Sequence, residues 1–220
     1  EPILSHVSFD IPQHGILGIQ GPSGRGKSTL LKLLMRYWDP QSGLVALSEV
    51  PLPQIDAHHR RRVQTMMGQE TYLFDGTIRE NLLMACDRGD ADRAGNAGDP
   101  DDSATSGRAL LTPPAPPVSW NAADSVLSTR MPLSVSDDVL RAALAKASAL
   151  ELVDSLPQGL DTPVGELGGR LSEGERQRIG LARVFLRNAS LVLFDEPTSR
   201  LDAYNESVIL QSIDALAQQG

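Results

Sequence analysis

A glycine-rich stretch at residues 21–28 has the residue types and the spacing of a phosphate-binding loop. Its sequence, GPSGRGKS, fits the pattern G-x-x-x-x-G-K-[ST] at every fixed position. Glycines let successive backbone N–H groups turn toward a phosphate, and the helix that follows adds the positive end of its dipole. We expect Lys27 to reach the β- and γ-phosphates of a nucleoside triphosphate and the Ser28 hydroxyl to bind Mg²⁺. The alternative is a glycine turn that merely joins a strand to a helix, which the strict match disfavours.

Two carboxylates, Asp195 and Glu196, follow the apolar run LVLF at residues 191–194. Such a run is typical of a strand buried on both faces of a parallel sheet, and the carboxyl end of such a strand faces the ligand-binding crevice. We expect Asp195 to hold Mg²⁺, directly or through water. Glu196 is then placed to orient and deprotonate an attacking water. The alternative, an acidic turn that only caps a strand, is disfavoured by the phosphate loop upstream.

The elements that position these residues follow from the apolar pattern. Residues 15–20 (GILGIQ) predict a strand, and leucines at helical spacing predict a helix over residues 28–38, which Asp39-Pro40 ends. Strand, glycine loop and helix together are the opening of a parallel α/β unit. Ser136 predicts the start of another helix, with acidic residues in its first turn and one apolar face. That face consists of Val139, Leu140, Ala143, Leu144, Ala147 and Leu150.

Composition limits the classes of protein that fit. The chain has 220 residues, of which 40% are hydrophobic, and this is enough for a sizeable core. Its formal net charge of -8 disfavours a nucleic-acid partner, which would require a basic face. Cys86 is the only cysteine, so no internal disulfide forms. No apolar run approaches the ~20 residues needed to cross a bilayer, and a first residue Glu1 in place of Met predicts a piece of a longer protein.

Residues 87–132 differ in kind from the rest of the chain. They are rich in Asp, Ala, Gly, Ser and Pro and include the run PPAPP at residues 113–117. Such a segment cannot bury enough apolar surface to offset the entropy lost on ordering. We therefore predict a disordered surface insertion here. Docking of the insertion on a partner stays open as an alternative, with Trp120 as its anchoring side chain.

Taken together, the motifs and their order resemble those of the ATPases of the ABC transporter superfamily. Residues 171–178 (LSEGERQR) resemble the family's signature, Gln69 its Q-loop, and residues 199–202 (SRLD) its D-loop. Residues 162–168 (TPVGELG) resemble the TxVGExG segment typical of exporters, and residues 74–82 (FDGTIRENL) share that exporter character. The resemblance covers nearly the whole chain apart from the insertion.

The resemblance implies a fold and a division of the chain. The fold is α/β, a P-loop NTPase (RecA-like) core with an inserted α-helical subdomain. Residues 1–68 and 184–220 are expected to form the ATP-binding core. Residues 69–183 are expected to form the Q-loop and the helical subdomain that carries the signature, with the insertion 87–132 inside it.

The resemblance also implies an activity and its partners. The ligands are ATP and Mg²⁺, and the reaction is ATP hydrolysis coupled to export of a solute. The partners are a second nucleotide-binding domain, identical or unlike, and the transmembrane domains of a transporter, which place the chain at the cytoplasmic side of the cell membrane. The Q-loop region and residues 162–168 are expected to form the surface that couples to those transmembrane domains.

The predicted site residues come from the phosphate loop, the Q-loop, the acidic pair and the signature. Catalysis is assigned to Glu196 and Lys27, and the predicted Mg²⁺ ligands are Ser28, Gln69 and Asp195. The predicted nucleotide contacts are Gly21, Ser23, Gly24, Gly26, Lys27, Ser28, Thr29, Gln69, Ser172 and Gly174.

The signature itself combines a local physical logic with two departures from the family pattern. Ser172 and Glu175 fit the capping-box pattern S-x-x-E, which predicts that a helix begins at Ser172. A helix N-terminus with a serine hydroxyl suits a γ-phosphate, and the resemblance places this one against the ATP of a second cassette. However, Glu173 replaces the first signature glycine and Glu175 the usual glutamine. A carboxylate near a triphosphate repels it unless Mg²⁺ or basic neighbours screen the charge. The resemblance includes exporters that pair an intact catalytic Glu with an altered signature, so an asymmetric pair stays open beside a pair of identical chains.

Two family elements are missing from the chain, and two other functions stay open. The adenine-stacking aromatic would precede Glu1, and the switch histidine would follow Gly220. One alternative is a soluble ABC ATPase not engaged in transport, which the exporter-like segments disfavour. The other is a low-turnover nucleotide-binding regulatory half, which the altered signature favours and Glu196 opposes.

Overall fold

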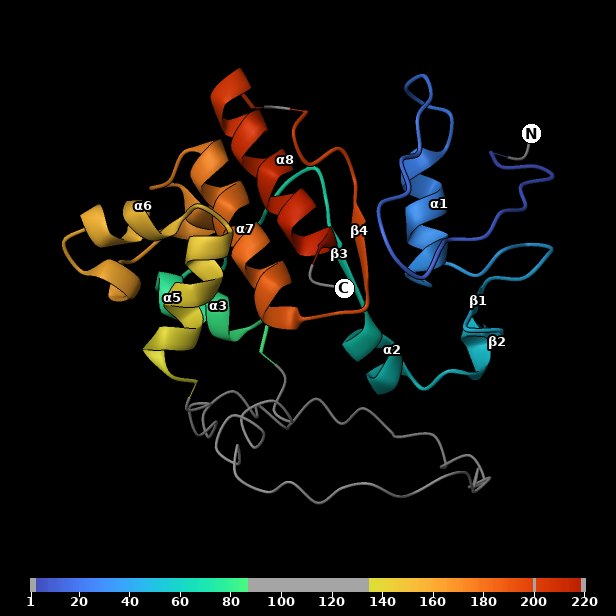
Figure 1. The fold of residues 1–220 in the computed structure, drawn as a ribbon, viewed down its shortest axis with the longest axis horizontal. Helices are drawn as coiled ribbons and strands as arrows, with labels where there is room; N and C mark the ends of the chain where they lie inside the picture. The colour runs from blue at the N-terminus through green and yellow to red at the C-terminus, as the bar shows by residue number, and fades with distance from the viewer. Residues whose placement is uncertain (1–2, 87–134, 200, 219–220) are drawn as a thin grey trace, which may run out of the picture. The chain divides into compact units, whose positions relative to one another are not determined.

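The computed structural model describes residues 3–86, 135–199 and 201–218 of the chain (Figure 1). The predicted insertion 87–132 lies outside the described residues. The elements in chain order are α1 (Lys27–Leu34), β1 (Ala46–Leu47), β2 (Val50–Pro51), α2 (Ala57–Val63), β3 (Gln64–Met67), α3 (Ile78–Leu83), α5 (Asp137–Lys146), α6 (Leu150–Ser155), α7 (Glu173–Arg187), β4 (Leu191–Phe194) and α8 (Ala203–Ala217). Short 3-10 helices lie at Leu52–Gln54, Gly159–Asp161 and Glu166–Gly168.

A parallel strand pair, β3 with β4, carries the acidic pair at its carboxyl end. The register runs from Gln64 opposite Leu191 to Met67 opposite Phe194. The amide N–H of Asp195 continues the pairing, since it donates to the Met67 carbonyl at 2.9 Å. A strand was predicted at 191–194, and this is confirmed, although only Leu193 of the run is fully buried. Parallel pairing of segments so far apart in sequence requires a crossover through helices, which defines an α/β arrangement.

The predicted strand at residues 15–20 is wrong. These residues form no strand in the described part of the chain, and the side chains of Ile16 and Leu17 are 59% and 45% exposed. A strand is stabilised by the hydrogen bonds of a neighbouring strand. Among the described residues β4 pairs only with β3, so this apolar run has no strand beside it.

Helix α1 is shorter than the leucine pattern predicts. It begins at Lys27, directly after Gly26, and ends at Leu34 rather than near Trp38. Arg36 has a left-handed backbone with φ of 52°, which cannot continue a right-handed helix. Leu31 is the residue of α1 that is fully buried.

The main hydrophobic core gathers around α7. Helix α7 packs against α3, α5 and β3, and α8 packs against α7 (Figure 1). The predicted apolar face of α5 is largely confirmed, because Leu140, Ala143, Leu144 and Ala147 are buried, whereas Val139 is exposed. The core also takes in buried side chains of the other packed elements, Met67, Leu73, Ile78, Leu82, Ala149, Val153, Leu160, Val164, Leu171, Ile179, Leu181, Ala182, Val184 and Ile209.

The helix predicted over residues 136–150 is interrupted. It ends at Lys146, Ser148 takes a left-handed conformation with φ of 52°, and α6 begins at Leu150. The described residues belong to one compact unit, residues 1–87 with 135–220. The division into a RecA-like core and a helical subdomain with the predicted boundaries stays a prediction. No helix among the described residues has both the length and the apolar character to cross a membrane.

Candidate functional site

The glycine loop leads directly into the first turn of α1. Gly24 and Gly26 have left-handed backbones with φ of 76° and 88°, which L-residues adopt only with strain. Lys27 is the first residue of α1, and its Nζ turns back over the loop to donate to the carbonyls of Gly21 (3.0 Å) and Pro22 (3.3 Å). Gly21, Ser23 and Gly24 are exposed on the loop, and Thr29 lies in the first turn of α1. The loop therefore presents backbone and one ammonium group to the solvent.

The two predicted Mg²⁺ ligands of the core come together. The Ser28 hydroxyl donates to Asp195 Oδ1 at 2.9 Å, although the two residues are 167 positions apart in the chain. A hydroxyl and a carboxylate are hard oxygen ligands, and Mg²⁺ prefers a few such ligands completed by phosphate oxygens and water. The described residues hold no group of three or more His, Cys, Asp or Glu side chains that would form an all-protein metal cage. The Ser28 hydroxyl and the Asp195 carboxylate therefore fit a Mg²⁺ site whose remaining ligands are nucleotide phosphate oxygens and water.

Glu196, the predicted general base, lies beside the phosphate loop. Its Oε1 is 3.6 Å from Lys27 Nζ, and its side chain is 45% exposed. Its backbone is left-handed with φ of 47°, a conformation that costs a non-glycine residue energy and occurs often at functional sites. The geometry gives Glu196 access to water and a basic neighbour.

Gln69 connects the Q-loop with the D-loop. Its Nε2 donates to the Ser199 hydroxyl at 3.0 Å, and its backbone carbonyl accepts from Gln177 Nε2 of α7 at 3.5 Å. In the described residues, Gln69 thus bonds to Ser199 rather than to Ser28 or Asp195. Its role as a Mg²⁺ ligand stays a prediction.

The signature begins a helix as the sequence predicts. Ser172 caps α7, with its Oγ accepting the Glu175 N–H (3.4 Å) and its own N–H donating to Glu175 Oε2 (2.7 Å). The Ser172 side chain is exposed, whereas Gly174 is buried. A Cβ at Gly174 would lie 2.9 Å from Asn205 Cγ, so glycine lets α7 approach α8. Ser172 and Gly174 stay predicted nucleotide contacts.

Asn205 is a residue that sequence reasoning missed. Its Oδ1 accepts from Arg178 Nη1 of α7 at 2.9 Å, and its N–H donates to Asp202 Oδ1 at 3.0 Å, which caps α8. The D-loop and the signature helix are therefore joined through one side chain. The signal was the D-x-x-N spacing from Asp202 to Asn205, which is typical of a helix start.

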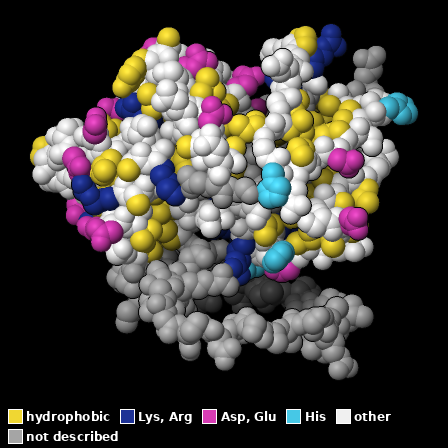
Figure 2. Space-filling model, viewed as in Figure 1, with side chains coloured by type: hydrophobic (Ala, Val, Ile, Leu, Met, Phe, Trp, Pro, Cys, Tyr) yellow, Lys and Arg dark blue, Asp and Glu magenta, His cyan; other side chains and the backbone are white. Residues whose placement is uncertain are grey.

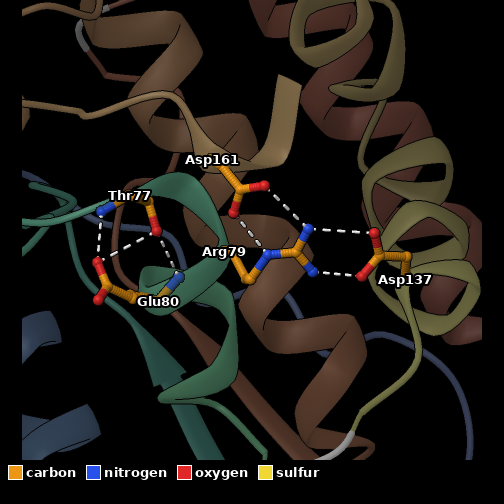
Figure 3. Close-up of polar contacts among 5 residues, drawn as sticks. All are labelled: Thr77, Arg79, Glu80, Asp137 and Asp161. Atoms are coloured by element: carbon orange, nitrogen blue, oxygen red, sulfur yellow. Dashed lines mark hydrogen bonds and ion pairs between the residues drawn. The ribbon is translucent and has the colours of Figure 1, made fainter. Parts of the chain in front are cut away.

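The two exporter-like segments bond to each other. The Ile78 N–H donates to the Thr162 carbonyl at 3.1 Å, and the Val164 N–H donates to the Gly76 carbonyl at 2.9 Å. Between these bonds Thr77 and Pro163 form an isolated antiparallel bridge. A capping box between Thr77 and Glu80 begins α3 at this point (Figure 3).

A second contact missed from the sequence is an ion network around Arg79 (Figure 3). Arg79 Nε donates to Asp161 Oδ1 at 2.7 Å, and both Nη atoms donate to the Asp137 carboxylate. Arg79 holds the pKa of both carboxyls below their usual range, and the carboxylates raise the pKa of the guanidinium. The network ties α3 to the first residue of α5 and to the 3-10 helix before the second exporter-like segment.

Arg183 and the buried Asn81 form a partly buried polar cluster. Arg183 Nε donates to the Asn81 carbonyl at 2.9 Å, and Nη1 donates to the Tyr72 carbonyl at 2.8 Å. Asn81 Nδ2 donates to the carbonyls of Phe74 and Thr77, both at 2.9 Å. Burial lowers the pKa of the Arg183 guanidinium. This cluster fixes the backbone of residues 72–77, where the first exporter-like segment begins.

Comparison with known proteins places these features in one family. The sequence profile of the ABC transporter family matches residues 4–199. A probable ABC transporter ATP-binding/permease protein of Haemophilus influenzae is 40% identical over 213 residues, which cover 97% of this chain and 30% of that protein. The mitochondrial iron-sulfur clusters transporter ATM1 of Saccharomyces cerevisiae is 33% identical over 96% of this chain and 24% of its own length.

A solved structure agrees with these relatives. The structure of a bacterial Atm1-family ABC exporter with ATP bound matches with a TM-score of 0.65 at 28% identity, over 89% of this chain and 26% of that one. The chain thus spans less than a third of the length of these relatives. The similarity covers the segments that carry the phosphate loop, the acidic pair and the signature.

Proposed function

The chain belongs to the ABC transporter family, and we propose that it is the Mg²⁺-dependent ATP-hydrolysing cassette of an exporter. The observation that carries the proposal is the meeting of two motifs far apart in sequence. Lys27 and Ser28 of the phosphate loop lie at 3.6 Å and 2.9 Å from Glu196 and Asp195, respectively. A glycine turn or an acidic strand cap would not require this convergence.

Each of the four side chains then has one task. The triphosphate lies on the loop with its β- and γ-phosphates at Lys27, which must leave its two loop carbonyls and Glu196 to meet them. Ser28 and Asp195 would hold Mg²⁺, which would supply positive charge to the phosphate oxygens. Glu196, freed from Lys27, orients the attacking water and accepts its proton.

A second cassette completes the site in this proposal. The exposed Ser172 at the N-terminus of α7 offers a hydroxyl, and the first turn adds the backbone N–H groups that the capping box does not use, which suits the γ-phosphate of ATP held by another nucleotide-binding domain. The joined D-loop and signature, through Asn205 and Arg178, would move as one piece on closure. The second domain is either another copy of this chain or an unlike one.

The partner transmembrane domains are proposed to dock on the surface formed by the Q-loop region and residues 162–168. Residues 74–82, which follow the Q-loop region, bond to residues 162–168, and the side chains of Tyr72, Phe74 and Leu167 are exposed. The Arg79 network and the Arg183 cluster hold this surface on the helical core. Export of a solute from the cytoplasmic side is the proposed outcome, and the similarity to a bacterial Atm1-family ABC exporter supports export as the direction of transport.

The test is the MgATP turnover of Glu196→Gln. This change keeps the shape of the side chain and removes the base, so binding of MgATP should persist while turnover falls about 10²–10⁴-fold. Glu151→Gln, on the surface of α6, is the matched control and should leave turnover unchanged. Full turnover in Glu196→Gln would disprove the role of the base. A chain that binds no MgATP would disprove the proposed function as a whole.

The same assay separates the alternatives. A low-turnover regulatory half would bind MgATP with no measurable hydrolysis at any protein concentration, even with a partner domain present. A soluble ATPase not engaged in transport would turn over without response to transmembrane domains.

A further inference from the structure

Both carboxylates that alter the signature are engaged by the chain itself. Glu175 Oε2 accepts the Ser172 N–H at 2.7 Å, within the capping box. Glu173 Oε2 accepts from Arg176 Nη2 at 2.5 Å, one turn along α7. The sequence predicts that Glu173 repels a triphosphate, but the structure pairs that carboxylate with a cation of its own helix.

The guanidinium of Arg176 is fixed at this place by further contacts. Its Nη1 donates to the Leu171 carbonyl at 2.8 Å and to the Gly168 carbonyl at 3.4 Å. The side chains of Arg176 and Glu173 are only 23% and 30% exposed, so water screens the pair less than it would a free surface pair. Arg176 therefore donates hydrogen bonds to the carbonyls of the turn before α7 and, at the same time, pairs with the Glu173 carboxylate of the signature.

Gly168, the last residue of the second exporter-like segment, makes room for this side chain. A Cβ there would lie 2.9 Å from Arg176 Cδ, and the backbone of Gly168 is left-handed with φ of 74°. A larger residue would have to push the arginine stem away from the turn. The position of the guanidinium thus depends on a glycine outside the signature.

We propose that Arg176 is a positioning residue, which neutralises Glu173 and so keeps the altered signature able to accept the triphosphate held by a second copy of this chain. The proposal rests on the proposed function, namely on closure of two cassettes over ATP. An ionised carboxylate next to Ser172 would oppose both the phosphate and the helix dipole that attracts it. Paired with Arg176, the same carboxylate adds almost no net charge at the N-terminus of α7.

A purely structural role for Arg176 makes a different prediction. If the residue only secured the carbonyls of Gly168 and Leu171, its loss would do the same damage whether or not position 173 carried a charge. If it acts through Glu173, removing that acid must rescue the loss. A double-mutant cycle separates the two roles.

The experiment measures MgATP-dependent dimerisation by light scattering over a range of protein concentrations. All variants carry Glu196→Gln, so that ATP is bound without being consumed. The test variants add Arg176→Met, Glu173→Gly or both changes to this background. Nucleotide binding is measured separately for each variant. Methionine keeps an unbranched stem and removes the charge. Arg141→Met is the matched control, because it breaks the ion pair of Arg141 with Asp154 (2.8 Å) on another surface.

We expect Arg176→Met alone to weaken the dimer on the order of tenfold or more. Together with Glu173→Gly it should weaken the dimer less than about twofold, and Arg141→Met should have no effect. Equal losses with and without Glu173→Gly would overturn the inference while the proposed function stands. So would a chain that dimerises only after Glu173→Gly. If every variant binds MgATP and none dimerises, closure of two copies is wrong, and the role of Arg176 with it.

Discussion

In the phosphate-loop region, residues 3–54, the apolar side chains that are buried among the described residues are Leu31 and Leu52. Apolar side chains lie at its surface instead (Figure 2). The signature region, residues 69–83 and 135–187, contains most of the main core. The signature region is stabilised by its own packing, whereas the phosphate-loop region leaves its backbone and charges available to a ligand.

Glycines show the same difference between the two regions. A Cβ at Gly21 or Gly24 of the phosphate loop would meet no atom within 4 Å. In the signature helix, a Cβ at Gly174 would lie 2.9 Å from Asn205 Cγ, and one at Gly180 would lie 2.6 Å from Thr71 Cγ2. Gly21 and Gly24 therefore leave open space beside the loop, whereas the helix glycines let neighbouring elements pack closely. Gly26 is the exception in the loop, since a Cβ there would lie 2.9 Å from Ile3 Cγ2 and from Leu4 Cδ2.

The largest effect expected from the difference between the two regions is at Lys27, in the phosphate-loop region. Lys27→Ala removes the charge expected at the β- and γ-phosphates, so affinity for MgATP should fall by about 100-fold or more. Its contacts without nucleotide are two exposed loop carbonyls and the Glu196 carboxylate, so the unliganded protein should keep its stability.

Calorimetry and thermal melts measure both quantities. MgATP at 100 times its Kd should stabilise the unchanged chain by about 2.7 kcal/mol, and the same concentration should stabilise Lys27→Ala by about 0.4 kcal/mol or less. Lys32→Ala, one turn further along α1, is the control and should keep its affinity. A large loss of stability in Lys27→Ala without nucleotide would show that the loop does depend on its own packing.

In the signature region the largest effect is expected on stability, at Arg183. Arg183→Met leaves the carbonyls of Asn81 and Tyr72 without their charged donor, and the Asn81 side chain, which is buried, loses its charged neighbour. The free energy of unfolding should fall by about 2–4 kcal/mol. Denaturant titration checks this, with Arg141→Met as the control for loss of an exposed arginine. An unfolding free energy equal to that of the control would mean that this cluster contributes nothing to the region's stability.

A smaller effect, dependent on pH, is expected at Arg79. Because Arg79 depresses the pKa of Asp137 and Asp161, the network stabilises the folded state above the ordinary aspartate pKa of about 4 and loses that contribution as pH falls through the lower, folded values. Arg79→Met should therefore lower the melting temperature at pH 7 by more than it does below pH 3. The same change at both values of pH would contradict the pairing.

The smallest effect is expected from replacing residues 87–132 with a short glycine-serine linker. Their composition predicts that they add no packed core, so the melting temperature should stay nearly unchanged. Differential scanning calorimetry measures this. A drop of many degrees would show that the segment contributes to the signature region.

The sequence by itself determined the local motifs of the candidate site and the start of the signature helix. The pattern of residues 21–28, the acidic pair after 191–194 and the capping box of Ser172 with Glu175 are local in the chain, and the structure has a loop, a strand end and a capped helix where they predict them. Caps and glycine turns depend on interactions within a few residues, which a sequence states directly. The i,i+3 spacing of Glu173 and Arg176 was equally readable and had been missed.

Only the tertiary structure decided which distant residues meet. Nothing local indicates that Arg79 pairs with Asp137 and Asp161, or that Arg183 bonds to Asn81, since these contacts join segments 58 to 102 positions apart. In the apolar run 15–20, by contrast, a local pattern predicts an element that the structure does not form. A strand exists only where a neighbouring strand supplies hydrogen bonds. Residue type and short spacing set what each side chain can do, and the packing around α7 sets which partners it reaches.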